Sequence, residues 1–227
     1  MISIVMAYHN RRKQFEQTFG SILKYSIQKD IELIIVDDAS KESERLEDII
    51  SCLSWVKLIR IEPKDKCWVN PCIPYNIGFN KVTGDKVIIQ NPECEHIGNI
   101  IEFVENNLTD HNYLSFACQA YNQKGQFKQW YNHPIINSTN LHFCSAITKK
   151  NLDILGGFDE RFSDGLAYDD NEFLHRVKRL GLSVECVEYP FVKHQWHEKI
   201  DHFANPKYRE LIKRNKAIFE TLTMKES

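Results

Sequence analysis

Carboxylate, amide and imidazole side chains gather in four short segments of the chain, each next to a hydrophobic stretch. These segments are Asp37-Asp38, Asn91-Pro92-Glu93, Asp169-Asp170, and the pair His194 and His197. A carboxylate at the carboxyl edge of a sheet can accept hydrogen bonds from a nucleotide base or ribose. Oxygen and imidazole ligands bind divalent cations, and a carboxylate can take a proton from a hydroxyl group. The four segments could therefore bind a nucleotide, hold a divalent cation near a diphosphate and take a proton from a hydroxyl group.

Each segment also has a plainer interpretation when it is taken alone. Asp37-Asp38 is typical of a turn at a strand end, and Asn91-Pro92 favours a turn by itself. Carboxylates at the start of a helix, such as Asp169-Asp170, are favoured by the helix dipole. His194 and His197 can be surface side chains, and either one could complete a metal site with Glu93.

The hydrophobic patterns predict the elements that position these side chains. The first part of the chain alternates strand and helix patterns, which are strands at 2–7, 31–36 and 56–61 and helices at 12–27 and 43–53. This order predicts a doubly wound parallel sheet that binds its ligand beyond the carboxyl ends of the strands. The later expected elements are a helix at 75–82, a strand at 86–89, a helix at 97–104, strands at 113–117 and 141–147, helices at 151–155 and 169–180, a strand at 183–187 and a helix at 206–222.

Composition narrows the class of protein. The chain has 227 residues with a net charge of -2, 42% hydrophobic and 26% charged residues, typical of one soluble α/β domain. This balance carries no strong signal for nucleic acid or membrane. The opening run 2–7 is too short for a signal segment, so we expect reduced thiols and a cytoplasmic location. A zinc site is a minor alternative because its ligand spacing is unusual; its residues would be Cys67, Cys72, Cys94 and His96.

Five blocks, taken in order, resemble the inverting glycosyltransferases of family 2, which have the GT-A fold. The resemblance extends from residue 2 to about residue 198. Its blocks are Ser3-Ile4-Val5-Met6-Ala7-Tyr8-His9-Asn10, Ile34-Ile35-Val36-Asp37-Asp38-Ala39-Ser40, Asn76-Ile77-Gly78 with Thr83-Gly84-Asp85, Gly156-Gly157-Phe158-Asp159-Glu160, and Asp169-Asp170 with Phe173 and Arg176. It implies a Rossmann-like, mostly parallel sheet with helices on both faces in a single domain. That domain would comprise a nucleotide-sugar half at 1–95, an acceptor half at 96–200 and a C-terminal helix within 201–227.

The resemblance also implies roles for individual residues. The nucleotide of a donor, expected to be a UDP-sugar, would be bound by Ala7, Tyr8, Asn10, Asp37, Asp38 and Asn76. Asp170, next to Asp169, would be the general base that deprotonates the acceptor hydroxyl. A divalent metal, Mn²⁺ or Mg²⁺, would be held by Glu93, Asn91 and His194. The segments 119–140 and 157–167 are expected to shape the choice of a glycan or another hydroxyl acceptor.

The chain departs from the family pattern at its metal motif. Asn91 and Glu93 stand where the family has two aspartates, and the loss of one charge should weaken cation binding. This departure leaves a second hypothesis, a nucleotide-sugar-binding pseudoenzyme or assembly subunit. A nucleotidyltransferase is a third hypothesis, but it predicts a glycine-rich phosphate loop, and the segment 8–13 has no glycine. No feature of the sequence determines an oligomeric state.

Overall fold

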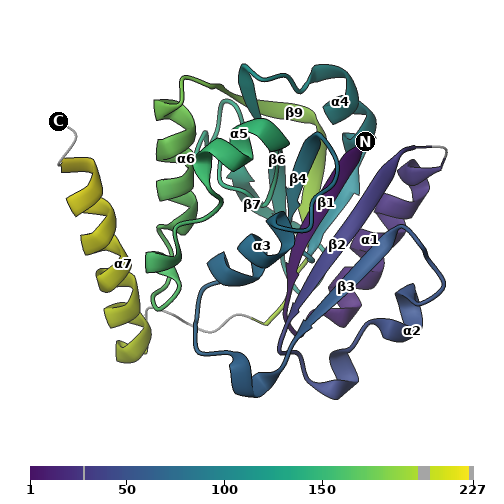
Figure 1. Ribbon diagram of the computed structural model, residues 1–227, viewed down its shortest axis with the longest axis horizontal. Coiled ribbons are helices and arrows are strands. Elements are labelled where there is room, and N and C mark those ends of the chain that lie inside the picture. Colours follow the sequence, from purple (N-terminus) through teal and green to yellow (C-terminus); the bar gives the residue numbers. More distant parts are fainter. Residues whose placement is uncertain (28, 199–204, 225–227) are drawn as a thin grey trace.

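The amino-terminal half of the chain builds four strands with one common direction. The computed structural model describes residues 1–27, 29–198 and 205–224. The strands are β1 (Ile2–Tyr8), β2 (Ile31–Asp38), β3 (Val56–Ile61) and β4 (Lys86–Gln90). They lie in the order β3-β2-β1-β4 and pair in parallel throughout (Figure 1). Their carboxyl ends therefore meet at one edge, where wound sheets bind ligands.

Hydrophobic side chains cover both faces of these strands. Successive residues of a strand point to opposite faces, so Met6 packs with Phe15 on one side while Val5 packs with Tyr75 on the other. Every residue of β2 is buried, as expected for a parallel strand that is covered on both faces. The helical elements of this half are α1 (Arg12–Ser26), η1 (Glu42–Glu44), α2 (Glu47–Ile50), η2 (Pro63–Asp65) and α3 (Cys72–Phe79).

The second half of the chain extends the same sheet with mixed strand directions. Its elements are β5 (Cys94–Ile97), α4 (Ile100–Asn107), β6 (Asn112–Tyr121), β7 (Phe127–Asn132), β8 (Cys144–Thr148), α5 (Lys149–Leu155), η3 (Glu160–Phe162), α6 (Asp169–Arg179), β9 (Ser183–His194) and α7 (Pro206–Met224). Beyond β4 the order is β8-β6-β9-β5, and β7 pairs with β6. Strand β8 is antiparallel to both neighbours, whereas β6 and β9 are parallel. The predicted α/β class with a wound sheet is confirmed.

Several predicted elements have different limits in the structure. The expected helix at 43–53 is interrupted at Arg45, which has an extended backbone, and only two short helical segments form. The expected helix at 97–104 begins later because Asn99 caps it through Glu102 N and the preceding residues form β5. The segment 119–140, expected to shape the choice of acceptor, contributes the end of β6 and all of β7.

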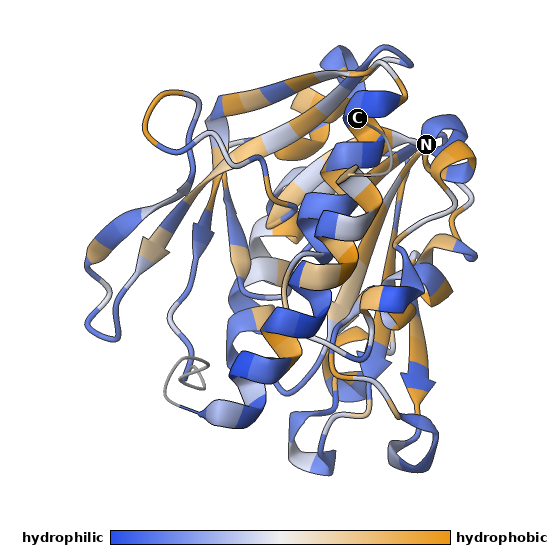
Figure 2. Cartoon of the chain, turned by 90° about the vertical axis from the view of Figure 1, so that its left-hand side faces the viewer, coloured by the Kyte–Doolittle hydropathy of each residue, from blue (hydrophilic) through white to orange (hydrophobic). Residues whose placement is uncertain are grey.

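Strand β9 and helix α7 are the last two elements of the fold. The last strand continues past the predicted 183–187 to His194, because its second part pairs with β5. Helix α7 stands beside α6, and Figure 2 shows it nearest the viewer with blue and orange residues alternating along it. Residues 201–204 and 225–227 of the predicted terminal segment lie outside the described residues. Within the described ranges, no helix is both long and apolar enough to cross a bilayer.

Candidate active site

The turns after β1 and β2 are bound to each other by hydrogen bonds. Asn10 has a left-handed backbone with a φ of 49°, and its N–H donates to Ser40 Oγ at 3.0 Å. The Asn10 side-chain oxygen accepts a hydrogen bond from Lys41 N at 2.9 Å. Tyr8 is fully buried and its hydroxyl donates to the Glu44 carbonyl, while Ala7 remains half-buried. The predicted nucleotide residues of β1 thus lie at one structured edge.

The two aspartates at the end of β2 have different environments. Asp37 is fully buried, accepts a hydrogen bond from Ser40 N and forms an ion pair with Arg60 at 2.6 Å. Its carboxylate holds the turn in place. The Asp38 carboxylate instead pairs with Lys66 Nζ at 2.7 Å and accepts a hydrogen bond from Trp68 Nε1 at 3.0 Å. Asp38 therefore connects this turn to the segment that follows β3.

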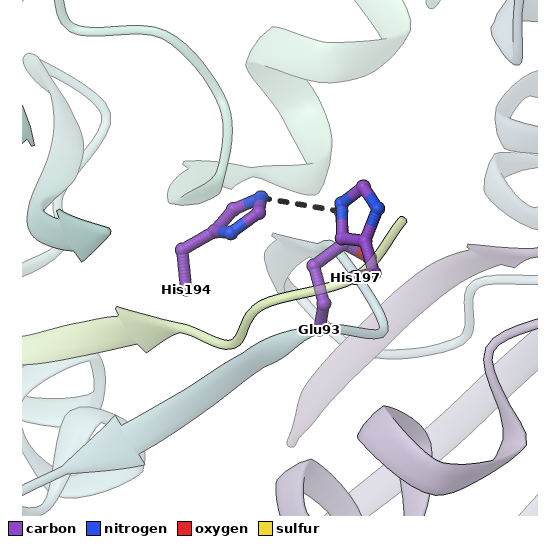
Figure 3. Close-up of side chains that lie close together, drawn as sticks. All are labelled: Glu93, His194 and His197. Carbon is purple, nitrogen blue, oxygen red and sulfur yellow. Dashed lines mark ion pairs between the residues drawn. The ribbon is translucent and has the colours of Figure 1, made fainter. Parts of the chain in front are cut away.

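One carboxylate and two imidazoles converge at the ends of β4 and β9. The ligand atoms of Glu93, His194 and His197 all lie within 4.8 Å of one another. Glu93 Oε1 lies 3.5 Å from His194 Nε2 and 3.7 Å from His197 Nε2 (Figure 3). The prediction named His194 as a ligand with His197 as its alternative, and the structure brings both side chains to Glu93.

Strand pairing explains how this cluster forms. In the ladder between β5 and β9, His194 lies opposite Cys94, the residue after Glu93. Gln195 N donates to the Glu93 carbonyl at 2.9 Å, which extends the contact beyond the strand. The Gln195 side chain also donates to Gln14 O and Thr18 Oγ1 of α1. These contacts hold α1, Glu93 and the segment after β9, which are far apart in the sequence, next to one another.

The charge state of the cluster suits metal binding. Burial would raise the pKa of the Glu93 carboxyl, but the hydrogen bond from His194 and the nearby charges of His194, His197 and Arg11 lower it to about 2. Burial lowers the pKa of His197, which favours the neutral form of the ring that can bind a metal. A carboxylate with neutral imidazole fits a divalent transition metal better than Mg²⁺, which prefers oxygen ligands.

Asn91 contributes an oxygen that is already engaged. Its Oδ1 accepts a hydrogen bond from the Tyr75 hydroxyl at 2.8 Å, and the same hydroxyl lies 3.1 Å from the Gln90 carbonyl. Tyr75 is almost completely buried, so its hydroxyl needs such an acceptor. Asn91 therefore supports the turn that carries Glu93, in addition to its predicted role as a metal ligand.

The acidic pair begins α6 directly after a left-handed residue, Tyr168, whose φ is 67°. Asp169 is buried and its Oδ1 accepts a hydrogen bond from Asn70 Nδ2 at 2.8 Å. Burial, followed by the charge of Asp169, raises the pKa of Asp170 to about 7. A carboxyl group with a pKa near neutral is well matched to proton transfer at that pH.

Asn76 lies on α3, and its side chain forms hydrogen bonds away from the other predicted nucleotide-binding residues. Its Nδ2 donates to the Phe158 carbonyl at 2.9 Å, and its Oδ1 accepts a hydrogen bond from Phe158 N at 2.8 Å. The same Nδ2 lies 3.0 Å from Glu160 Oε1. These contacts connect Asn76 to the loop after α5, and none of them reaches the turns at Asp38 or Glu93.

The sequence did not point to three polar residues of the site, which are Arg11, Lys66 and Asn70. Two of them lie in the segment 62–74, which has no clear periodicity. A lysine and an asparagine in a proline-containing loop after a strand were the available signal. The importance of Lys66 and Asn70 depends on contacts with Asp38 and Asp169, which lie 28 and 99 residues away in sequence.

The alternative zinc site is not assembled. All seven cysteines are free, and Cys67 is exposed whereas Cys72 and Cys94 are buried. The Cys72 thiol donates to Asn70 Oδ1 at 3.1 Å. Across the described ranges, only the Glu93 cluster groups three or more potential His, Cys, Asp and Glu ligands.

Known proteins share both the sequence pattern and the fold. The profile of glycosyl transferase family 2 matches residues 3–165. Chondroitin synthase of Escherichia coli is 26% identical over 239 residues, which cover 86% of this chain but only 34% of that protein.

Two solved structures with 14% sequence identity have a similar fold. The structure of S. aureus TarS 1-349 with UDP-GlcNAc has a TM-score of 0.72 and covers 94% of this chain and 65% of that one. A mannosyltransferase from Pyrobaculum calidifontis with GDP-Man and Mn²⁺ has a TM-score of 0.66 and covers 96% and 64%. The chain thus spans only part of each of these relatives. Because the family profile matches most of its length, the chain belongs to glycosyl transferase family 2.

Proposed function

We propose that the chain transfers a sugar from a nucleotide-sugar donor to an acceptor hydroxyl with inversion at the anomeric carbon. The observation that carries this proposal is that two groups are linked through the same helix. One group is the cluster of Glu93, His194 and His197, which could hold a metal, and the other is the acidic pair Asp169-Asp170. Helix α3 connects the two groups: Asn70, just before the helix, donates to Asp169 Oδ1 at 2.8 Å, and Tyr75 within it donates to Asn91 Oδ1, in the turn that carries Glu93, at 2.8 Å. Groups that share a reaction centre must be held in a fixed relative position, and α3 provides such a connection.

The donor is proposed to lie over the ends of β1, β2 and β4. Ala7 and Asp38 lie at the ends of β1 and β2, Asn10 lies in the turn between β1 and α1, and Lys66 adds a cation at the same edge. The TarS complex contains UDP-GlcNAc, which supports a UDP-sugar as the first candidate. The mannosyltransferase complex contains GDP-Man, so guanosine donors belong in the same test.

A divalent cation would be held by Glu93, His194 and His197, with Asn91 next to them. The donor set of one carboxylate and two imidazoles fits Mn²⁺ better than Mg²⁺. When bound, the cation would neutralise charge that develops on the leaving diphosphate. Arg11, whose charge lowers the pKa of Glu93, adds a fixed positive charge near this position.

Asp170 is proposed to act as the general base. Its carboxylate takes the proton of the acceptor hydroxyl while the hydroxyl oxygen bonds to the anomeric carbon. The bond from that carbon to the phosphate oxygen breaks, and the nucleoside diphosphate leaves with the electron pair. Attack opposite the leaving group inverts the anomeric configuration. Asn70 holds the adjacent Asp169 and thereby supports the start of α6.

The test is a screen for nucleotide release from UDP- and GDP-sugars with Mn²⁺ present, followed by the same assay on Asp170→Asn. We expect one donor to be hydrolysed slowly in water and faster with an acceptor. The variant should bind UDP with wild-type affinity in calorimetry but lose release by at least about 100-fold. Unchanged release by Asp170→Asn would exclude Asp170 as the base.

A binding subunit without transfer activity is the second candidate, favoured by one observation. Asn91 supplies a neutral oxygen at a position where the family pattern has a carboxylate, and that oxygen is bonded to Tyr75. This candidate predicts UDP binding that does not depend on Mn²⁺ and no release from any donor. Hydrolysis of a single nucleotide sugar would exclude it.

A further inference from the structure

The segment that leads into the acidic pair has an unusual backbone. Ala167 and Tyr168 are consecutive non-glycine residues with φ angles of 60° and 67°. Left-handed conformations of this kind are unfavourable for such residues and persist only where surrounding contacts hold them. Asp169 and Asp170 follow directly, so the direction of both carboxylates depends on how these two residues are held.

Asn215 of helix α7 binds the peptide group between the two left-handed residues. Its Nδ2 donates to the Ala167 carbonyl at 2.9 Å and to the Phe162 carbonyl at 3.0 Å. Asn215 is fully buried, although most of α7 is exposed. A buried amide that bridges two carbonyls of one loop has the geometry of a structural clamp.

Helix α7 makes further contacts with the same loop. Gly165 passes so close to the Asn215 amide that a Cβ atom would overlap it. Leu166 N donates to the Leu211 carbonyl at 3.3 Å, and the Tyr168 ring packs on Phe219 with centroids 5.7 Å apart. On its other side the loop is held by Val69 N and Asn70 N, which both donate to Ser163 O at 2.9 Å.

We infer that Asn215 is a positioning residue that fixes the segment 162–168 and thereby directs the carboxylate of Asp170 toward the acceptor. This inference rests on the proposed role of Asp170 as the base. Helix α7 would then contribute to the active site, because it supplies the only side-chain amide that is hydrogen-bonded to Ala167 O within the described residues. Without that bond, the peptide is free to leave its left-handed conformation, and the start of α6 moves with it.

Two variants disturb the clamp from opposite sides. Asn215→Ala removes the amide, and Gly165→Ala displaces it by steric overlap without straining the backbone of residue 165. Leu222→Ala is the matched control, because it removes another partly buried side chain of α7 from the same hydrophobic core but leaves both hydrogen bonds of Asn215 in place. A general loss of helix packing would affect all three proteins alike.

The experiment measures UDP release from UDP-GlcNAc with Mn²⁺ and water as the acceptor, together with amide hydrogen exchange. We expect both clamp variants to lower kcat by about 10- to 100-fold while KM for the donor changes less than about twofold. Amides of the segment 165–171 should exchange faster in both clamp variants, but not in Leu222→Ala. Wild-type exchange there or a wild-type kcat in Asn215→Ala would overturn the inference.

The variant Asp170→Asn separates this inference from the proposed function. If Asp170→Asn retains wild-type release, the proposed base is wrong, and the exchange data alone then decide whether Asn215 holds the segment. If Asp170→Asn loses at least about 100-fold and retains a measurable residual rate, the double variant Asn215→Ala, Asp170→Asn should be no slower than Asp170→Asn. An additive loss would show that Asn215 acts through another group and would refute the assignment.

Discussion

Replacing Asp169 with asparagine tests how the proposed base acquires its pKa. Burial and then the charge of Asp169 raise the pKa of Asp170 from 3.8 to about 7. Asp169→Asn removes the charge but keeps an oxygen that can accept the hydrogen bond from Asn70, now 2.8 Å long. The variant therefore changes the electrostatic environment of Asp170 and leaves the contacts of the helix start in place.

The size of the effect follows from the order of the two causes. Burial is the larger cause and remains in the variant, while backbone hydrogen bonds oppose the rise, so we expect the pKa of Asp170 to fall by only about one pH unit. A general base works only when it is ionised. The acid limb of the rate profile should therefore move from about pH 7 to about pH 6.

The assay is the initial rate of donor hydrolysis between about pH 5 and about pH 9 at constant ionic strength and saturating Mn²⁺. Asp153→Asn is the matched control, since it also removes one carboxylate, but that side chain is 59% exposed on α5. Its profile should coincide with that of the wild type. An Asp169→Asn midpoint that stays in place or moves upward would refute the electrostatic coupling inferred from the structure.

Three further predictions concern the metal cluster and the fold. Glu93→Gln and His197→Ala should each raise the Mn²⁺ concentration for half-maximal release by at least about 10-fold, whereas exposed His111→Ala should not. Asn91→Asp should lower that concentration about 3- to 10-fold, because a carboxylate adds charge and still accepts the bond from the Tyr75 hydroxyl; an unchanged metal titration would contradict this. Glu32→Ala should reduce the free energy of unfolding by about 2 kcal/mol at neutral pH in urea titrations, since buried Ser3 and Thr83 N lose their acceptor. Burial would raise the pKa of the Glu32 carboxyl, but hydrogen bonds with Lys57, Ser3 and Thr83 lower it to about 2. The stabilisation by Glu32 is therefore present above about pH 4.5 and is lost as pH falls through about 2.

Much of the amino-terminal half could be predicted because its signals are local. Strands such as β1 and β2 are mostly apolar runs, and the order of runs and helical patterns predicts a parallel wound sheet. The later elements were harder to predict. Cys94–Ile97 is a strand only because it pairs with the far end of β9, a partner about one hundred residues away.

The residues of the candidate site also divide into those that the sequence predicts and those that it does not. Asp38, Glu93 and Asp170 could be recognised because each follows or begins a regular element, and such positions gather at one edge of a wound sheet. The sequence alone could not choose between His194 and His197, and it contained no sign that Asn215 reaches the loop before Asp169. Hydrophobic periodicity determines which elements form and which face of each is buried. The distances between side chains of different elements depend on how those elements pack, so only the tertiary structure determined them. It placed both His194 and His197 next to Glu93, and it placed the buried amide of Asn215 against the Ala167 carbonyl.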